Sequence, residues 1–253
     1  KQNPEFTFAA QGATEVSLTV TDNKKGRNTK TVTIDVGRGA ISLDLLWSYP
    51  YDDTKDAYVF GTSPAVSPDG EYVYVTSTGY SLVCFTKAGE RLWAFDIGKD
   101  GASAENNSGS IKVQSPTPSV DEDGTVYAAT QKTGSVAAHV TAISAQGVKR
   151  WEHAADGDIN GVPAVDDQGF VYYNDRTTGK LVKLRPEDGS RVAEIKLADE
   201  LRSSPTISYD GTIYVNGMKD DKPTVFAVKG AAEGCAASWS QQGGNPSKTE
   251  YMY

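Results

Sequence analysis

Hydrophobic and polar positions alternate along most of the chain in short runs that recur at a regular spacing. In residues 204–215 a proline-led apolar stretch leads into an Asp-Gly turn, and the next run alternates β-branched or aromatic residues with smaller ones. Alternation with period two predicts β-strands, and glycine supplies the positive φ that tight hairpin turns require. Each copy is therefore expected to form a β-hairpin. The other copies lie at 63–75, 117–127 and 162–172.

Each hairpin is followed by a further apolar run, and in the first two repeats a glycine turn then leads into a fourth strand ending at Trp93 or Trp151. The third strands are expected at 82–85, 140–143, 181–184 and 225–228. Four strands per unit, with 54, 45 and 42 residues between the prolines that open the units, is the period of propeller blades.

These repeats resemble the quinoprotein-like propeller family, whose blades join a proline-led Asp-Gly hairpin to a Leu-Tyr-Ala-Leu-like strand and a Gly-x-x-x-Trp strand. The resemblance covers about residues 41–245, and the third repeat has 192–195 in place of the tryptophan strand. It implies an all-β fold, a four-repeat β-propeller with four-stranded blades. It also implies that Trp93 and Trp151 dock between blades.

Residues 1–36 differ from the repeats, because two threonine- and valine-rich runs, 13–22 and 29–36, alternate strictly around a turn. This hairpin resembles the last strands of a PKD-type immunoglobulin-like domain, whose earlier strands the sequence lacks. We expect residues 1–36 to be the C-terminal part of such a domain and the natural protein to extend further upstream. Residues 37–253 are then the propeller.

Two complementary gaps suggest how the propeller closes. Residues 45–47 have the pattern of a fourth strand without its first three, and the last repeat passes from its third strand into a tail, 230–253, without a fourth. We therefore expect 41–47 to be the closing strand of the last blade, which removes the open edges. Two assemblies stay open: a four-bladed monomer, or a dimer in which each chain supplies half of an eight-bladed ring.

The net charge of −8 argues against a nucleic-acid partner, which requires basic patches. No run approaches 18 apolar residues, so we expect no membrane span. A removed leader is compatible with the sequence, and the resemblance suggests an extracytoplasmic protein, at the cell surface or in the periplasm, with a lipid anchor upstream. Cys84 and Cys235 either form a disulfide or remain two separate thiols.

One segment has the spacing of a calcium-binding loop. Asp156, Asp158 and Asn160 alternate before a glycine, and Asp167 stands at the twelfth position, where an EF-hand has glutamate. A polar connection between two blades explains the same residues, and both interpretations stay open. Pyrroloquinoline quinone is not expected, because catalytic quinoproteins hold it with neighbouring cysteines that this chain lacks. We expect no other cofactor.

The segments that precede each first strand are expected to line the mouth of the central channel. Four of their side chains, Lys112, Gln114, Asn160 and Arg202, are donors that could hold a carboxylate or a sugar hydroxyl, unless these loops are simply solvated. No sequence pattern of a catalytic site occurs, so we expect no enzyme. The sequence therefore favours a binding or assembly platform of the cell envelope that engages a protein partner through propeller loops. The alternative is a glycan-binding or glycan-processing surface module.

Overall fold

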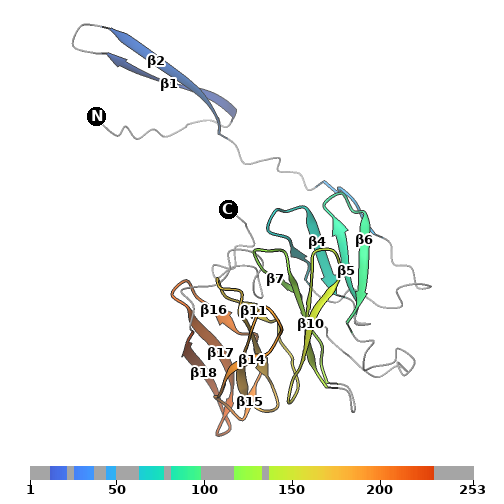
Figure 1. The fold of residues 1–253 in the computed structure, drawn as a ribbon. Helices are drawn as coiled ribbons and strands as arrows, with labels where there is room; N and C mark the ends of the chain where they lie inside the picture. Colours follow the sequence, from blue (N-terminus) through green and yellow to red (C-terminus); the bar gives the residue numbers. More distant parts are fainter. Residues whose placement is uncertain are drawn as a thin grey trace. The chain divides into compact units, whose positions relative to one another are not determined.

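The computed structural model describes residues 12–21, 26–36, 44–49, 63–76, 81–97, 117–132 and 137–230. All the regular elements in these ranges are β-strands (Figure 1). The chain divides into two compact units, Lys1–Leu46 and Trp47–Tyr253.

The first unit contains one antiparallel hairpin of β1 (Gly12–Thr21) and β2 (Arg27–Val36). Thr19 faces Thr29 across the two strands, and their hydroxyl oxygens are 2.8 Å apart. Cross-strand hydroxyl pairs of this kind stabilise a ladder. The hairpin predicted from the alternating residues is therefore present, and its assignment to an immunoglobulin-like domain stays a prediction.

The second unit contains four antiparallel sheets, here called blades one to four, which follow one another along the chain. A two-residue inner strand begins each of the first three blades. Three longer strands follow it in sequence order, and each pairs with the strand before it. The fold is therefore the expected all-β propeller architecture with four-stranded blades. Blade one contains β3 (Ala65–Val66), β4 (Tyr72–Thr76), β5 (Ser81–Thr86) and β6 (Arg91–Asp96); blade two β7 (Ser119–Val120), β8 (Val126–Ala129), β9 (His139–Ile143) and β10 (Lys149–Ala154); blade three β11 (Ala164–Val165), β12 (Val171–Asp175), β13 (Lys180–Leu184) and β14 (Arg191–Lys196).

Blade four reaches four strands in a different way. Its inner strand is split into β15 (Glu200–Leu201) and β16 (Thr206–Ile207), and both pair with β17 (Thr212–Lys219). On the other side of β17 lies β18 (Lys222–Lys229), which takes the place of a third strand. Among the described residues no strand pairs with the outer edge of β18, whereas β6, β10 and β14 fill that position in the other blades.

The core of the described residues consists of three hydrophobic clusters, each shared by two successive blades. They join blade one to two, blade two to three and blade three to four. Within the described ranges no such cluster joins blade four to blade one. Burial of apolar surface between sheets is the main stabilising contribution in such a fold.

Three tryptophans dock onto the turn before the fourth strand of a blade, as the resemblance implied for two of them. Each indole N–H donates to a turn carbonyl at 2.7–2.9 Å, and each ring covers the glycine of that turn. These glycines have positive φ, and a Cβ at any of them would overlap the ring. The three sets are Trp47 with Lys87 and Gly89, Trp93 with Ala145 and Gly147, and Trp151 with Pro186 and Gly189.

The predicted closing strand lies only partly in the described residues, because 41–43 fall outside them. Residues 44–49 contain no strand, and Leu45 and Leu46 are exposed. Closure of the ring by this segment stays a prediction. Cys84 is a buried free thiol, and burial raises its pKa to about 12. Cys235 lies outside the described residues.

Candidate functional site

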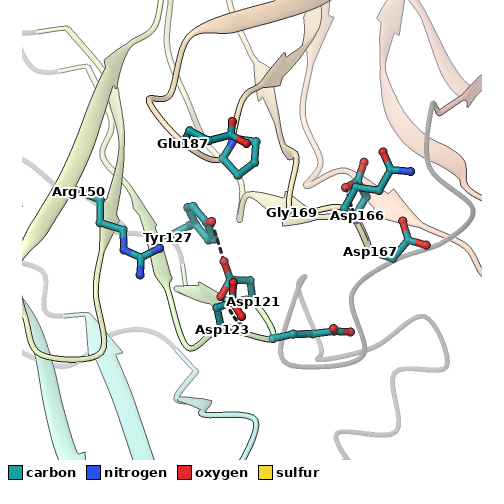
Figure 2. Close-up of a pocket in the computed structure, with 11 residues that line it drawn as sticks. Asp121, Asp123, Tyr127, Arg150, Asp166, Asp167, Gly169 and Glu187 are labelled. Carbon is teal, nitrogen blue, oxygen red and sulfur yellow. Dashed lines mark hydrogen bonds between the residues drawn. The ribbon is translucent and has the colours of Figure 1, made fainter.

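A pocket of about 400 Å³ opens between blades two and three (Figure 2). It is formed mainly by the β7–β8 and β11–β12 hairpin turns, with contributions from β10 and from the β13–β14 turn. The turns meet there because the two blades pack side by side through a shared hydrophobic cluster. The lining residues are Asp121, Glu122, Asp123, Tyr127, Arg150, Asp166, Asp167, Gln168, Gly169, Pro186 and Glu187.

Asp121 organises the turn of blade two from the floor of this pocket. One carboxylate oxygen accepts the backbone N–H groups of Asp123 at 3.0 Å and Thr125 at 2.8 Å, and the other accepts the Tyr127 hydroxyl at 2.8 Å. Asp121 and Tyr127 are both buried. Burial raises the pKa of Asp121, and these hydrogen bonds act in the opposite direction.

Asp166 repeats this arrangement in blade three. Its carboxylate accepts the backbone N–H of Phe170 at 2.9 Å and the Tyr172 hydroxyl at 2.8 Å. The ammonium group of Lys183 lies 3.7 Å from the same carboxylate and 3.8 Å from the centre of the Phe170 ring. Burial raises the pKa of Asp166 and lowers that of Lys183, although their mutual attraction opposes both shifts. The two buried aspartates therefore hold the turns in place.

The exposed side chains give the pocket its charge. Glu122, Asp123, Asp167 and Glu187 are exposed carboxylates, whereas Arg150 is the one cation among the described lining residues. Figure 2 shows Arg150 on the Tyr127 side of the pocket and Asp167 on the far side. Carboxylates gathered in a recess raise the local concentration of cationic groups. The pocket therefore favours positively charged ligands.

The aspartate–tyrosine pairs were not foreseen from the sequence, although the repeats contain a signal for them. In blades two and three an aspartate stands six residues before the tyrosine of the second strand. In blade one the turn instead begins with Ser67, seven residues before Tyr74, and the Ser67 hydroxyl donates to Asp69 at 2.6 Å. Tyr74 is buried there, and within the described part of the chain its hydroxyl has no hydrogen-bond partner.

The residues expected at the channel mouth are described only in part. Asn160 accepts a hydrogen bond from Gln131, and Arg202 donates two hydrogen bonds to Glu200 at 2.6 and 2.8 Å. Arg176 donates to the other oxygen of Glu200 at 2.6 Å. Hydrogen bonds from Arg202 and then Arg176 lower the pKa of Glu200. Lys112 and Gln114 lie outside the described residues.

The residues with calcium-loop spacing bind different partners. Both carboxylate oxygens of Asp156 accept hydrogen bonds from Arg191 at 2.9 Å, which lowers the pKa of Asp156. Asp158 accepts the backbone N–H of Lys132 at 2.7 Å, and Asp167 lines the pocket between the blades. In the described part of the chain no three His, Cys, Asp or Glu side chains are grouped to hold a metal ion. Whether the segment binds calcium stays open, and binding would require Asp156 to release Arg191.

A search of the described residues for a helix long and apolar enough to cross a membrane finds none.

A family model described as outer membrane protein assembly factor BamB matches residues 17–137 and 136–251, and so covers most of the chain. Comparison with curated proteins gives no match.

Among solved structures, the chain is similar to the Cps50 (Swd1) β-propeller domain of Myceliophteria thermophila, with 14% identity, a TM-score of 0.53 and coverage of 78% of this chain and 64% of that one. It is also similar to BamB from Moraxella catarrhalis, with 15% identity, a TM-score of 0.47 and coverage of 67% and 50%. A third similar structure is virginiamycin B lyase from Staphylococcus aureus, with 13% identity, a TM-score of 0.48 and coverage of 70% of this chain and 57% of that one. The chain therefore spans less than two thirds of each of these proteins. At such identities the Cps50 likeness shows the β-propeller fold alone.

Proposed function

The chain belongs to the family of the outer membrane protein assembly factor BamB, and we propose that it is a non-catalytic binding or assembly platform of the bacterial cell envelope. In this proposal it engages a protein partner through the turns and loops at the ends of its blades. Location outside the cytoplasm, at the cell surface or in the periplasm, is part of the proposal. A lipid anchor upstream of Lys1 would hold it there.

The observation that carries the proposal is the acidic pocket between blades two and three. Two successive blades form it together, so its shape depends on the packing of the propeller rather than on a single loop. Its buried carboxylates, Asp121 and Asp166, bind backbone N–H groups and tyrosine hydroxyls, which fixes the turns. A rigid recess rimmed by exposed carboxylates is suited to recognition, because little entropy is lost on binding.

The charge of the pocket indicates the chemistry of the partner. We infer that the partner presents a basic segment, whose lysine or arginine side chains pair with Asp123, Asp167 and Glu187. Such contacts steer association and fix its orientation more than they add affinity. Because these carboxylates are exposed, binding should weaken as the salt concentration rises.

The buried carboxylates give no support to catalysis at this pocket. A general acid or base needs a proton-transfer position within reach of substrate. Asp121 and Asp166 instead have both oxygens engaged in hydrogen bonds to turn atoms and to the tyrosines. Their raised pKa values arise from burial in the fold.

A glycan-binding or glycan-processing surface module is the second candidate. The observation that favours it is the convergence of Arg176 and Arg202 on Glu200, because the Arg202 side chain is still 58% exposed. An arginine fork of this kind can bind the carboxylate of an acidic sugar. Asn160 could add a hydrogen bond to a sugar hydroxyl.

One experiment separates the two candidates. The tagged chain is incubated with envelope extract in one arm and with a panel of neutral and acidic oligosaccharides in the other. We expect a discrete protein to be retained and no saturable binding of sugars. Saturable sugar binding that is lost in Arg202→Ala and Asn160→Ala, without retention of any protein, would overturn the platform proposal in favour of the glycan module.

A further inference from the structure

Each blade uses the same face to pack against the blade that follows it. Tyr74, Tyr127 and Tyr172 pair with the inner strands of blades one, two and three at the same register position. Each belongs to the cluster shared with the next blade, and they are 0%, 1% and 3% exposed. This forward face, marked by the second-strand tyrosine, is therefore covered in three blades.

Blade four has the same face, but the described residues leave it uncovered. Its tyrosine at this register position, Tyr214, is 44% exposed. On the third strand Val225 occupies the position of Leu82, Val140 and Leu181, as the strand pairing shows. Those three side chains are buried, whereas Val225 is 74% exposed. The forward face of blade four thus has the residues of an interface, and no blade of the described residues packs against it.

Blade one shows the complementary feature. Its turn glycine, Gly89, is covered by Trp47, whose indole N–H donates to the carbonyl of Lys87 at 2.9 Å. The Trp47 ring also stacks on Phe85, with 5.9 Å between ring centres. In blades two and three the docked tryptophan comes from the fourth strand of the preceding blade. Trp47 therefore stands where a preceding blade would place its tryptophan.

We propose that a second copy of this chain covers the exposed face of blade four. Blade one of that copy, with Trp47 docked on it, would follow blade four, as blades two, three and four follow their predecessors. The reciprocal contact would join blade four of the second copy to blade one of the first, so that two chains close a ring of eight blades. An interface between unlike surfaces closes when the rotation between subunits completes a ring.

The same chain does not cover this face in the described residues. The hydrophobic clusters stop at the junction of blades three and four, and Tyr214 and Val225 remain exposed. A single exposed apolar side chain requires no explanation. Two exposed side chains at positions that are buried in the other three blades indicate an interaction surface.

The test is the molar mass of the chain in solution, measured by sedimentation over a range of concentrations. The expected species has twice the chain mass of 27.0 kDa. Val225→Glu should weaken the dimer at least about tenfold, because a carboxylate buried without a partner is costly. Val148→Glu is the matched control, since Val148 is 62% exposed in the β9–β10 turn, away from this face.

A monomer of 27.0 kDa at every concentration would overturn the proposal, and so would a dimer that Val225→Glu leaves intact. Circular dichroism of Val225→Glu checks that its strands persist. If that variant misfolds, Ala227→Arg provides a second change at an exposed position of the same face. The outcome is independent of the partner proposal, because no extract or glycan is present.

Discussion

The indole ring of Trp93 lies so close to Gly147 that a Cβ at Gly147 would be 2.7 Å from the nearest ring atom. The backbone of Gly147 also has a φ of 80°, which residues other than glycine rarely adopt. Two separate constraints therefore require glycine in this turn of blade two, and one of them comes from the neighbouring blade.

Gly147→Ala should reveal this contact between blades. Gly70 is the matched control, because it has a φ of 72° and nothing within 4 Å of an added Cβ. In both alanine variants the strained backbone should lower the free energy of unfolding by about 1 kcal/mol. Overpacking against Trp93 should lower it by about a further 1–3 kcal/mol in Gly147→Ala. Urea denaturation measures the free energy of unfolding of each. Equal losses of stability in the two variants would contradict the prediction, because they would mean that the Trp93 ring moves aside without cost.

Tyr127→Phe and Tyr74→Phe should differ, although the two tyrosines occupy equivalent positions. The Tyr127 hydroxyl donates to Asp121 at 2.8 Å, so its removal should cost about 1–2 kcal/mol and raise the pKa of Asp121 further. The Tyr74 hydroxyl is buried and has no partner among the described residues, so Tyr74→Phe should leave stability unchanged or increased. Thermal denaturation compares the two variants. A larger loss for Tyr74→Phe would contradict the assigned hydrogen bonds.

The pH dependence of stability should have opposite signs at Asp121 and Asp156. Burial raises the pKa of Asp121 above 3.8, so the folded state binds the proton more tightly, and stability is lost as pH rises from 3.8 through the raised value. Arg191 lowers the pKa of Asp156, so its contribution is present above pH 3.8 and is lost as pH falls.

The two asparagine variants make this difference measurable. Relative to Asp121→Asn, the wild-type protein should become less stable between acidic and neutral pH. Relative to Asp156→Asn, it should become more stable over the acidic range. Denaturant titrations at several pH values give both differences, and the same sign at both sites would contradict the account of burial and pairing.

Calcium is tested by thermal denaturation with the ion and with a chelator. Binding at Asp156 and Asp158 must first break the two hydrogen bonds from Arg191, so we expect no change in Tm. A ligand at about a hundred times its Kd would add roughly 2.7 kcal/mol to stability and shift Tm visibly. A calcium shift that disappears in Asp158→Asn would establish the loop as a site. The same denaturation experiment with pyrroloquinoline quinone in place of calcium tests that cofactor.

Much of the fold could be predicted from the sequence, because strand alternation and turn glycines are local signals. The hairpin led by Pro205 and the fourth strand of blade one, which contains Trp93, are two such cases. The docking of Trp93 followed from the family resemblance. The docking of Trp47 did not, since nothing in residues 45–47 indicates which turn they would contact.

The candidate site was largely missed, because it depends on register and on packing between blades. Asp121 lies six residues before Tyr127 and accepts its hydroxyl. Ser67 lies seven residues before Tyr74 and has a smaller side chain, and the Tyr74 hydroxyl finds no partner in the described ranges. The pocket itself arises only when the turns of two blades meet. Its charge could be counted in the sequence, but its location could not.

The central claim is that the acidic pocket binds a basic segment of an envelope protein. The most direct test is the affinity of the captured partner for the wild-type chain, for Glu187→Lys in the pocket and for Glu90→Lys, which reverses an exposed carboxylate in the corresponding turn of blade one. We predict that Glu187→Lys raises Kd about fivefold or more, with a smaller salt dependence, and that Glu90→Lys leaves Kd unchanged. Equal affinities for all three proteins would contradict the claim.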